Sequence, residues 1–282
     1  MTQTSDGVEI VEAIVVTLDI CSSSVLIEDL MKNNRSKLWR DLIINMKEYL
    51  LEHVPYYNAE LHKFIGDGWI IFFRRPYASE HLLRFLYDTN WHFMHLYEES
   101  VVPSLDTTPD ISGLTFGIDE GRLIKLEMKE TIEFVGRPIN IACRLQGKLE
   151  KADIENGYRI LMSNRLFNDL KLDFQNYYHE RTTKPLKNIG EGKQFTCYLI
   201  SIDKLLWLVE AHYGTDTHDL VDVTAQYASQ IKDNRLNVKV TNAIAGGDPS
   251  PLQSKTLWVT YCWKGQRKEI SVNERSWLKL PL

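Results

Sequence analysis

The stretch "HKFIGDGWIIFF", residues 62–73, contains two apolar runs separated by Gly66, Asp67 and Gly68. Asp-Gly between apolar segments is a strong signal for a β-hairpin, because both residues tolerate the positive φ of a tight turn. On this interpretation Asp67 is only a turn residue. On the other interpretation the hairpin holds the Asp67 carboxylate at a metal ion, which requires a second carboxylate from elsewhere in the chain. The stretch by itself leaves both interpretations open.

The overall composition is that of an ordinary soluble globular protein. Of the 282 residues, 44% are hydrophobic and 25% are charged, and the length is enough for one large domain or two unequal ones. The longest apolar runs fall far short of the roughly 20 residues that span a bilayer, and the N-terminus does not resemble a secretory signal. We therefore expect a cytoplasmic protein without a membrane helix.

Cysteine content and net charge exclude two further classes of protein. The four cysteines are widely scattered and form no CxxC pair, which is typical of reduced thiols and not of a disulfide framework or a zinc site. A net charge of −5 argues against binding a nucleic acid polymer, whose affinity depends on neutralising many phosphates. A small anionic substrate stays possible if metals or local basic residues supply positive charge.

Periodicity along the chain predicts an α/β or α+β domain. Residues 11–20, "VEAIVVTLDI", predict a buried strand that ends near Asp19, and the serines after it offer N-cap side chains for a helix. Residues 113–121 and 122–128 predict two strands with a turn at Glu120 and Gly121. Residues 136–151 predict a helix, with Pro138 near its first turn.

The composition changes after residue 203. We expect a first domain over residues 1–203, a linker over 204–214 and a small β-rich domain over 215–282. The last of these contains two strand-like runs, 255–263 and 268–274.

Two carboxylates are candidates for a shared site. If the hairpin pairs beside the first strand, Asp19 and Asp67 converge next to the N–H groups of a helix start. Hard divalent cations bind such oxygens, so a triphosphate with two metal ions is the natural occupant. The alternative is that Asp19 caps a helix and Asp67 forms a turn.

Four motifs in order resemble the catalytic domain of the class III nucleotidyl cyclases over roughly residues 10–203. They are "TLDICSSS" (17–24), "KFIGDG" (63–68), "EFVGRPINIACRL" (133–145) and "PLKNIG" (185–190). The most specific element is Asn140 and Arg144, which match the family's Gly-x-x-x-Asn-x-x-x-Arg helix. The resemblance implies an α+β, ferredoxin-like domain with a central, mainly antiparallel sheet and flanking helices.

The resemblance also implies roles for individual residues. Asp19 and Asp67 would bind two divalent metal ions, Mn²⁺ or Mg²⁺, with the Ile20 carbonyl as a further ligand. Arg144 would stabilise charge on the α-phosphate and Asn140 would position the ribose. The remaining candidates would bind the triphosphate: Lys187, which Asn188 follows where the family has glycine, and Ser22, Ser23 and Ser24, which replace the family's glycine, aromatic residue and threonine.

Subunit organisation follows from the same resemblance. In the family the two aspartates come from one subunit, and the asparagine and arginine come from the other. One copy of each pair per chain therefore implies a head-to-tail homodimer with two equivalent shared sites.

Lys63 and Glu133 match the family's base-reading pair. A lysine donates and a glutamate accepts, so the pair can serve adenine or cytosine, and it can also serve uracil. Hydrogen bonding thus leaves the base open. Glu133 is longer than the aspartate usual for adenine, which would shrink the base pocket and favour a pyrimidine.

The tail looks like the sensor-type C-terminal domain that is fused to some bacterial cyclases. The whole chain is thus similar to the pyrimidine cyclases of the Pycsar anti-phage system. This resemblance implies conversion of UTP to cyclic UMP, which would activate a separate effector protein. Alternatives are a cytidylate cyclase, an adenylate cyclase and a non-catalytic nucleotide-binding regulator.

Overall fold

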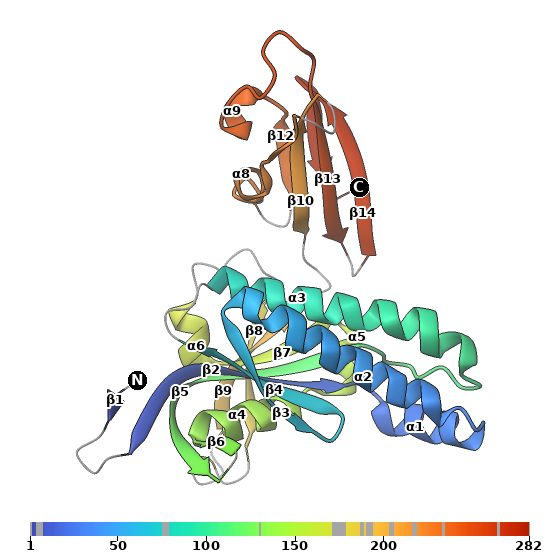
Figure 1. The fold of residues 1–282 in the computed structure, drawn as a ribbon, viewed down its shortest axis with the longest axis vertical. Coiled ribbons are helices and arrows are strands. Elements are labelled where there is room, and N and C mark those ends of the chain that lie inside the picture. Colours follow the sequence, from blue (N-terminus) through green and yellow to red (C-terminus); the bar gives the residue numbers. More distant parts are fainter. Residues whose placement is uncertain are drawn as a thin grey trace. The chain divides into compact units, whose positions relative to one another are not determined.

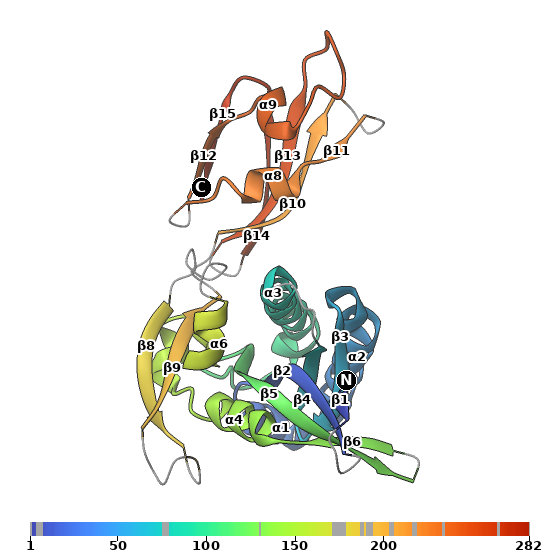
Figure 2. The same cartoon turned by 90° about the vertical axis from the view of Figure 1, so that its left-hand side faces the viewer.

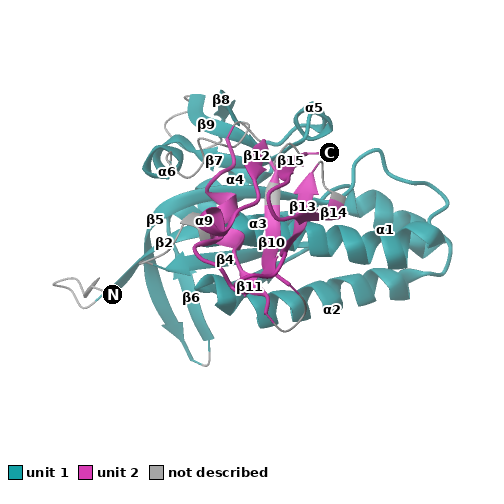
Figure 3. Cartoon of the chain, turned by 90° about the horizontal axis from the view of Figure 1, so that it is seen from above, with its two compact units in different colours: residues 1–173, 179–200 teal, residues 174–178, 201–282 magenta. Residues whose placement is uncertain are grey.

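The computed structural model describes residues 2–3, 8–74, 79–129, 131–170, 179–186, 189, 194–202, 206–215, 219–232, 235–263 and 266–281. The chain divides into two compact units, one of residues 1–173 and 179–200 and the other of residues 174–178 and 201–282 (Figure 3). Each unit has its own β structure and its own apolar core. In the part of the chain that the structure describes, no helix is long and apolar enough to cross a membrane.

The first unit is built on a mixed sheet with the strand order β3-β4-β2-β5-β7-β9-β8 (Figure 1). β2 lies between β4 and β5 and is antiparallel to both, whereas β7 is parallel to β5. Two further strands extend the sheet, β1 beside β2 and β6 beside β5. The strands are β1 (Thr2–Gln3), β2 (Glu9–Ile20), β3 (Ala59–Ile65), β4 (Gly68–Arg74), β5 (Leu114–Met128), β6 (Thr131–Val135), β7 (Tyr158–Ser163), β8 (His179–Pro185) and β9 (Gln194–Ser201).

Helices cover both faces of this sheet. Figures 1 and 2 show α4 on one face and α2 and α3 on the other. The α-helices are α1 (Ser23–Lys32), α2 (Ser36–His53), α3 (Ser79–Leu96), α4 (Arg137–Gln146), α5 (Lys151–Glu155) and α6 (Asn164–Asp169). Single turns form η1 (Val54–Tyr57), η2 (Tyr97–Val101) and η3 (Val102–Ser104).

β2 is the central strand because its side chains are apolar on both faces. Ile14 and Val16 are fully buried on one face, while Ala13 and Val15 pack on the other with Ala142 of α4. A strand that is covered on both sides reads as a nearly continuous apolar run, as residues 11–20 do. The fold is thus the predicted α+β arrangement of a central sheet with flanking helices, and its sheet is mixed.

The turn that the sequence predicts at Glu120 and Gly121 is wrong, because β5 runs through it without a break. Gly121 lies opposite Ala13 in the middle of the β2–β5 ladder, and pairing continues as far as Ile124. Gly121 has a φ of 151°, and a Cβ there would lie 2.9 Å from the Pro138 ring of α4. Glycine is therefore needed for the close approach of the helix rather than for a turn.

The second unit is a small antiparallel β structure. One sheet has the order β11-β10-β13-β14, and a second one pairs β12 with β15. Its elements are β10 (Trp207–Gly214), β11 (Val221–Asp222), α8 (Thr224–Ala228), β12 (Leu236–Lys239), α9 (Asn242–Ala245), β13 (Thr256–Trp263), β14 (Gln266–Asn273) and β15 (Trp277–Leu280).

Residues 204–214 were expected to form a linker. Residues 207–214 instead form β10, which belongs to the four-stranded sheet of the second unit. Leu208, Ala211 and Tyr213 of β10 are buried in the core of the second unit, and the strand pairs with β13. The expected linker is therefore corrected for these residues, because their alternate side chains are apolar and find a core to fill.

Candidate functional site

Asp19 and Asp67 lie side by side in the first unit. Asp19 is opposite Gly68 in the antiparallel β2–β4 pair, so Asp67, in the turn before β4, is one residue from the position that faces Asp19. The two carboxyl groups are close enough for the negative charge of Asp67 to raise the pKa of Asp19. A Cβ on Gly68 would lie 2.2 Å from the Leu18 carbonyl oxygen and 3.1 Å from Asp19 Oδ1, so glycine leaves room for the Asp19 carboxylate.

The electrostatics of this pair suit a cation. Burial and, next, the negative charge of Asp67 raise the pKa of Asp19 to about 6, although hydrogen bonds from Gln146 and from the Ile20 N–H act in the opposite direction. Two carboxylates at one place repel unless a proton or a cation lies between them. Carboxylate oxygens are also the ligands that Mg²⁺ and Mn²⁺ prefer.

The donor set is incomplete by itself. Among the described residues, no group of three or more His, Cys, Asp or Glu side chains could hold a metal ion. Mg²⁺ is commonly held by one or two carboxylates together with substrate phosphates and water. Asp19 and Asp67 therefore fit divalent ions whose remaining ligands are phosphate oxygens and water.

Gln146 and Thr115 complete the surroundings of Asp19, although the sequence did not point to either. Gln146 Nε2 donates to Asp19 Oδ2 at 3.2 Å and to Thr115 Oγ1 at 2.9 Å. Thr115 lies directly opposite Asp19 in the β2–β5 pair. No local pattern could have found them, because the contacts depend on strand register and on the place where α4 crosses the sheet.

The three serines begin helix α1 immediately after β2. Ser22 occupies the N-cap position with φ 55° and ψ 24°, and its side chain makes no cap hydrogen bond. The predicted serine cap is therefore wrong at Ser22, because its Oγ instead donates to the Ile111 carbonyl at 3.0 Å. Ser23 is buried and Ser24 is exposed. The first N–H groups of α1 lack partners within the helix and point back toward the end of β2.

Lys63 of β3 and Glu133 of β6 are also brought together. Lys63 Nζ lies 3.1 Å from both carboxylate oxygens of Glu133. The two side chains are 49% and 25% exposed, so the pair is open to solvent and to a ligand. His62 Nε2 lies 3.7 Å from Glu133 Oε2 on the buried side.

Asn140 and Arg144 are on α4, where Gly117 of β5 permits an unusually close contact. A Cβ on Gly117 would lie only 2.0 Å from the Ala142 carbonyl oxygen. At about 100° per residue, Asn140 and Arg144 are separated by about 40° around the helix, whereas Gln146 is about 200° from Arg144. Gln146 contacts Asp19, so Asn140 and Arg144 lie on another side of α4.

Each chain thus presents two separate groups of candidate residues. Within the described part of the chain, the side chains of Asn140 and Arg144 form no hydrogen bond or ion pair, with Asp19 and Asp67 or with any other residue. The further triphosphate candidate Lys187 lies outside the described residues.

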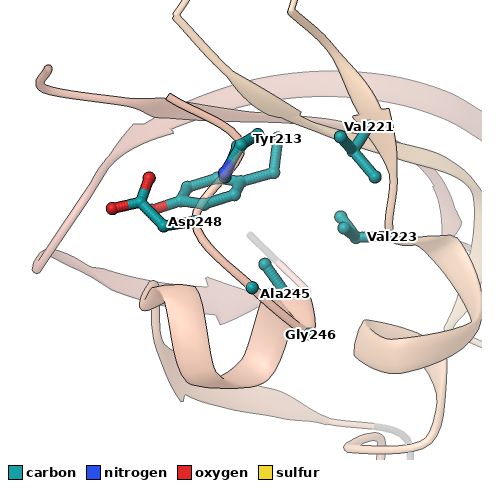
Figure 4. A pocket seen from close by; sticks show the side chains of 8 residues that line it. Tyr213, Val221, Val223, Ala245, Gly246 and Asp248 are labelled. Atoms are coloured by element: carbon teal, nitrogen blue, oxygen red, sulfur yellow. The ribbon is translucent and has the colours of Figure 1, made fainter. Parts of the chain in front are cut away.

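The second unit contains a cavity of about 240 Å³ (Figure 4). It is lined by the ring of Tyr213, by Val221 and Val223, and by residues 245–249. The Asp248 carboxylate at its edge pairs with the buried Lys255 at 2.9 Å. Lys255 Nζ also donates to the carbonyl oxygens of Ser250 and Gln253. The loop "GGDP" (246–249) is therefore stabilised by the ion pair between Asp248 and Lys255.

Comparison with known proteins rests on structure alone. No family model and no curated protein matches the sequence. Solved structures that resemble the chain include the adenylyl cyclase CyaB from P. aeruginosa, with TM-score 0.53 and 19% identity over 68% of this chain and 95% of that one. A bacterial light-regulated adenylyl cyclase has TM-score 0.51 and 18% identity over 68% of this chain and 52% of that one. The guanylyl cyclase Cya2 has TM-score 0.51 and 13% identity over 68% of this chain and 93% of that one. This chain therefore has the fold of the class III nucleotidyl cyclase domain, to which small antiparallel sheets are added.

Proposed function

We propose that this protein is a nucleotidyl cyclase, which converts a nucleoside triphosphate into a 3′,5′-cyclic nucleotide and pyrophosphate. The observation that carries the proposal is the convergence of Asp19 and Asp67 at the strand end that precedes α1. On this fold, two carboxylates beside free helix N–H groups suit a metal-bound triphosphate. No serine, cysteine or histidine nucleophile is required for such a reaction.

Asp19 and Asp67 would hold two divalent ions, Mn²⁺ or alternatively Mg²⁺, with the Ile20 carbonyl as a further ligand. When bound, such ions acidify the ribose 3′-hydroxyl and neutralise the pyrophosphate that leaves. Gln146 orients the Asp19 carboxylate through its hydrogen bond to Oδ2. The backbone at Ser22, Ser23 and Ser24 would bind phosphate oxygens at the start of α1.

Arg144 and Asn140 would act on the same substrate from a second copy of the chain. Arg144 would stabilise the charge that develops on the α-phosphate, and Asn140 would position the ribose. Lys187 would bind the triphosphate. A homodimer is needed because Asn140 and Arg144 lie on a side of α4 other than the side that contacts Asp19.

Exposed apolar side chains support a dimer at this place. Phe64 and Ile65, just before the Asp67 turn, are 43% and 39% exposed. Ile132 and Val135 of β6 flank Glu133 and are 54% and 45% exposed. Large exposed apolar side chains that gather near a polar site are typical of protein interfaces. A head-to-tail pair of chains would cover them and complete two sites.

UTP is the substrate that we propose, with cyclic UMP as the product. Lys63 would donate to the uracil O4 carbonyl and Glu133 would accept from N3–H. The length of Glu133 would leave less room for a purine. The second unit would act as a sensor in anti-phage defence, and the product would activate a separate effector protein.

The first test is turnover with all four nucleotides. The purified protein is incubated with Mn²⁺ and equimolar ATP, GTP, CTP and UTP, and the products are identified by mass spectrometry. Formation of cyclic UMP alone would support the full proposal. Formation of cyclic CMP or cyclic AMP would support cyclase activity but correct the assignment of the substrate base. Tight nucleotide binding without any cyclic product would favour a non-catalytic regulator.

The shared site is tested by complementation. Asp67→Asn and Arg144→Ala each remove one half of every homodimeric site, so each variant alone should be inactive. When the two variants are mixed and re-assembled, half of the dimers are hybrids, and each hybrid has one intact site of its two. Roughly a quarter of the wild-type activity should therefore return. A mixture as inactive as its parts would contradict the shared site.

A further inference from the structure

The strand that carries Lys63 contains one extra residue. In the β3–β4 pair Leu61 lies opposite Ile71 and Lys63 lies opposite Ile70, so His62 has no partner on β4. Neighbouring side chains of a regular strand point to opposite faces, whereas a bulge redirects them. Here His62 and Lys63 both reach the carboxylate of Glu133, which two adjacent residues of a regular strand could not do.

Aromatic packing fixes the His62 imidazole. Its side chain is only 6% exposed. The ring stacks on Phe72 with 4.6 Å between ring centroids and an angle of 22° between planes, and it meets the edge of Phe134 at 5.4 Å. Phe72 and Phe134 are themselves buried in the apolar cluster that packs against α4. The imidazole therefore has one orientation, while Lys63 is half exposed and free to turn.

Glu133 thus lies between one movable group, which is bonded to it, and one fixed group, which faces it. The Lys63 ammonium bridges both carboxylate oxygens, and His62 Nε2 faces only Oε2. A base that donates an N–H to Glu133 must take a position that Lys63 occupies. If Lys63 turns to the base, His62 Nε2 still faces Oε2 at 3.7 Å, and Oε1 is the oxygen left to accept from the base.

The charge of this group favours an accepting carboxylate. Burial lowers the pKa of His62, and Lys63 and Arg74 act in the same direction, while Glu133 and Glu60 oppose them. At pH 7 the imidazole is therefore neutral, and the positive charge that faces Glu133 comes from Lys63. An ionised carboxylate accepts stronger hydrogen bonds than a neutral group.

We propose that His62 is a positioning residue for nucleotide selection, because its fixed imidazole orients Glu133 toward an N–H on the hydrogen-bonding edge of the substrate base. This inference rests on the proposed function, since it takes Lys63 and Glu133 as the groups that contact the base. His62 itself does not touch the nucleotide. Its loss should reduce the preference among bases and leave binding of the triphosphate unchanged.

The test measures binding without turnover. The affinity of the full-length protein with Mn²⁺ is measured for the four 3′-deoxynucleoside triphosphates, which lack the attacking hydroxyl. His62→Phe keeps an aromatic ring in the stack and removes both nitrogens. It should weaken binding of the preferred nucleotide about tenfold and change binding of the other three less than about twofold. His62→Gln restores an N–H and should recover part of the preference.

A second variant and a control keep the test decisive. If His62→Phe does not fold, as judged by circular dichroism, His62→Met fills the same apolar site without a nitrogen. His95→Phe changes a half-exposed histidine of α3 and should alter none of the four affinities. An equal loss for all four nucleotides, or an unchanged preference, would overturn the role of His62.

The outcomes also separate this inference from the cyclase proposal. A wild-type protein that binds one nucleotide selectively but forms no cyclic product would refute the cyclase, and the ratio of affinities would still test His62. A wild-type protein that binds none of the four nucleotides would refute both.

Discussion

Replacing Asp119 by Asn should stabilise the protein at neutral pH, because Asp119 is a buried carboxyl under helix α4. It lies on β5 opposite Val15 and is only 5% exposed. Burial raises the pKa of Asp119 to about 6, although hydrogen bonds from Ser163 and from the backbone, and the charge of Arg137, lower it. The residue therefore costs free energy whenever it is ionised.

The magnitude follows from the pKa shift. A rise from 3.8 to about 6 corresponds to about 3 kcal/mol, because each pKa unit is worth about 1.4 kcal/mol. Between these two pKa values the folded protein binds a proton that the unfolded chain has lost, so the free energy of unfolding falls as the pH rises. Below about pH 4 both states are protonated and the penalty vanishes. An Asn side chain is neutral at every pH, so the Asp119→Asn variant does not have this free-energy penalty.

Urea denaturation of the wild type and of Asp119→Asn at several pH values between 4.5 and 7.5 measures this difference. The advantage of the variant in free energy of unfolding should grow by about 2 kcal/mol across that range, because about 1 kcal/mol of the penalty is already present at pH 4.5. Asp106→Asn, at an exposed position, serves as the control and should show no such trend. A difference between wild type and Asp119→Asn that is independent of pH would refute the reasoning.

Gln146→Ala removes the amide that orients Asp19 and should raise the Mn²⁺ concentration needed for half-maximal turnover about tenfold. A rise below twofold in a Mn²⁺ titration would contradict this role. Gly117→Ala places a Cβ 2.0 Å from the Ala142 carbonyl oxygen, so α4 must shift and the free energy of unfolding should fall by about 3 kcal/mol. An unchanged midpoint of urea denaturation would show that the helix moves at no cost. Ile132→Lys puts a charge on the exposed β6 surface and should weaken dimerisation at least tenfold in sedimentation velocity; a dimer of unchanged affinity would place the interface elsewhere.

Local patterns in the sequence were enough for an α/β or α+β domain, and the resemblance to the class III cyclases narrowed this to the α+β fold. The apolar run over residues 11–20 predicted the buried strand, since a strand that is covered on both faces needs no polar alternation. The Asp67–Gly68 dipeptide predicted the turn before β4, because turn chemistry is decided by the residues of the turn itself. The spacing of Asn140 and Arg144 predicted a shared helix face, which the 3.6-residue period guarantees.

Tertiary structure alone decided how these elements meet. The glycine at position 121 suggested a turn, but long-range pairing with β2 keeps β5 continuous there. Gln146 and Thr115 became neighbours of Asp19 through strand register and helix packing, and the bulge turned His62 toward Glu133. Register, bulges and helix crossings depend on contacts between residues far apart in the chain. A local sequence pattern carries no information about such contacts, which is why Gln146, Thr115 and His62 appeared beside the candidate residues only in the folded protein.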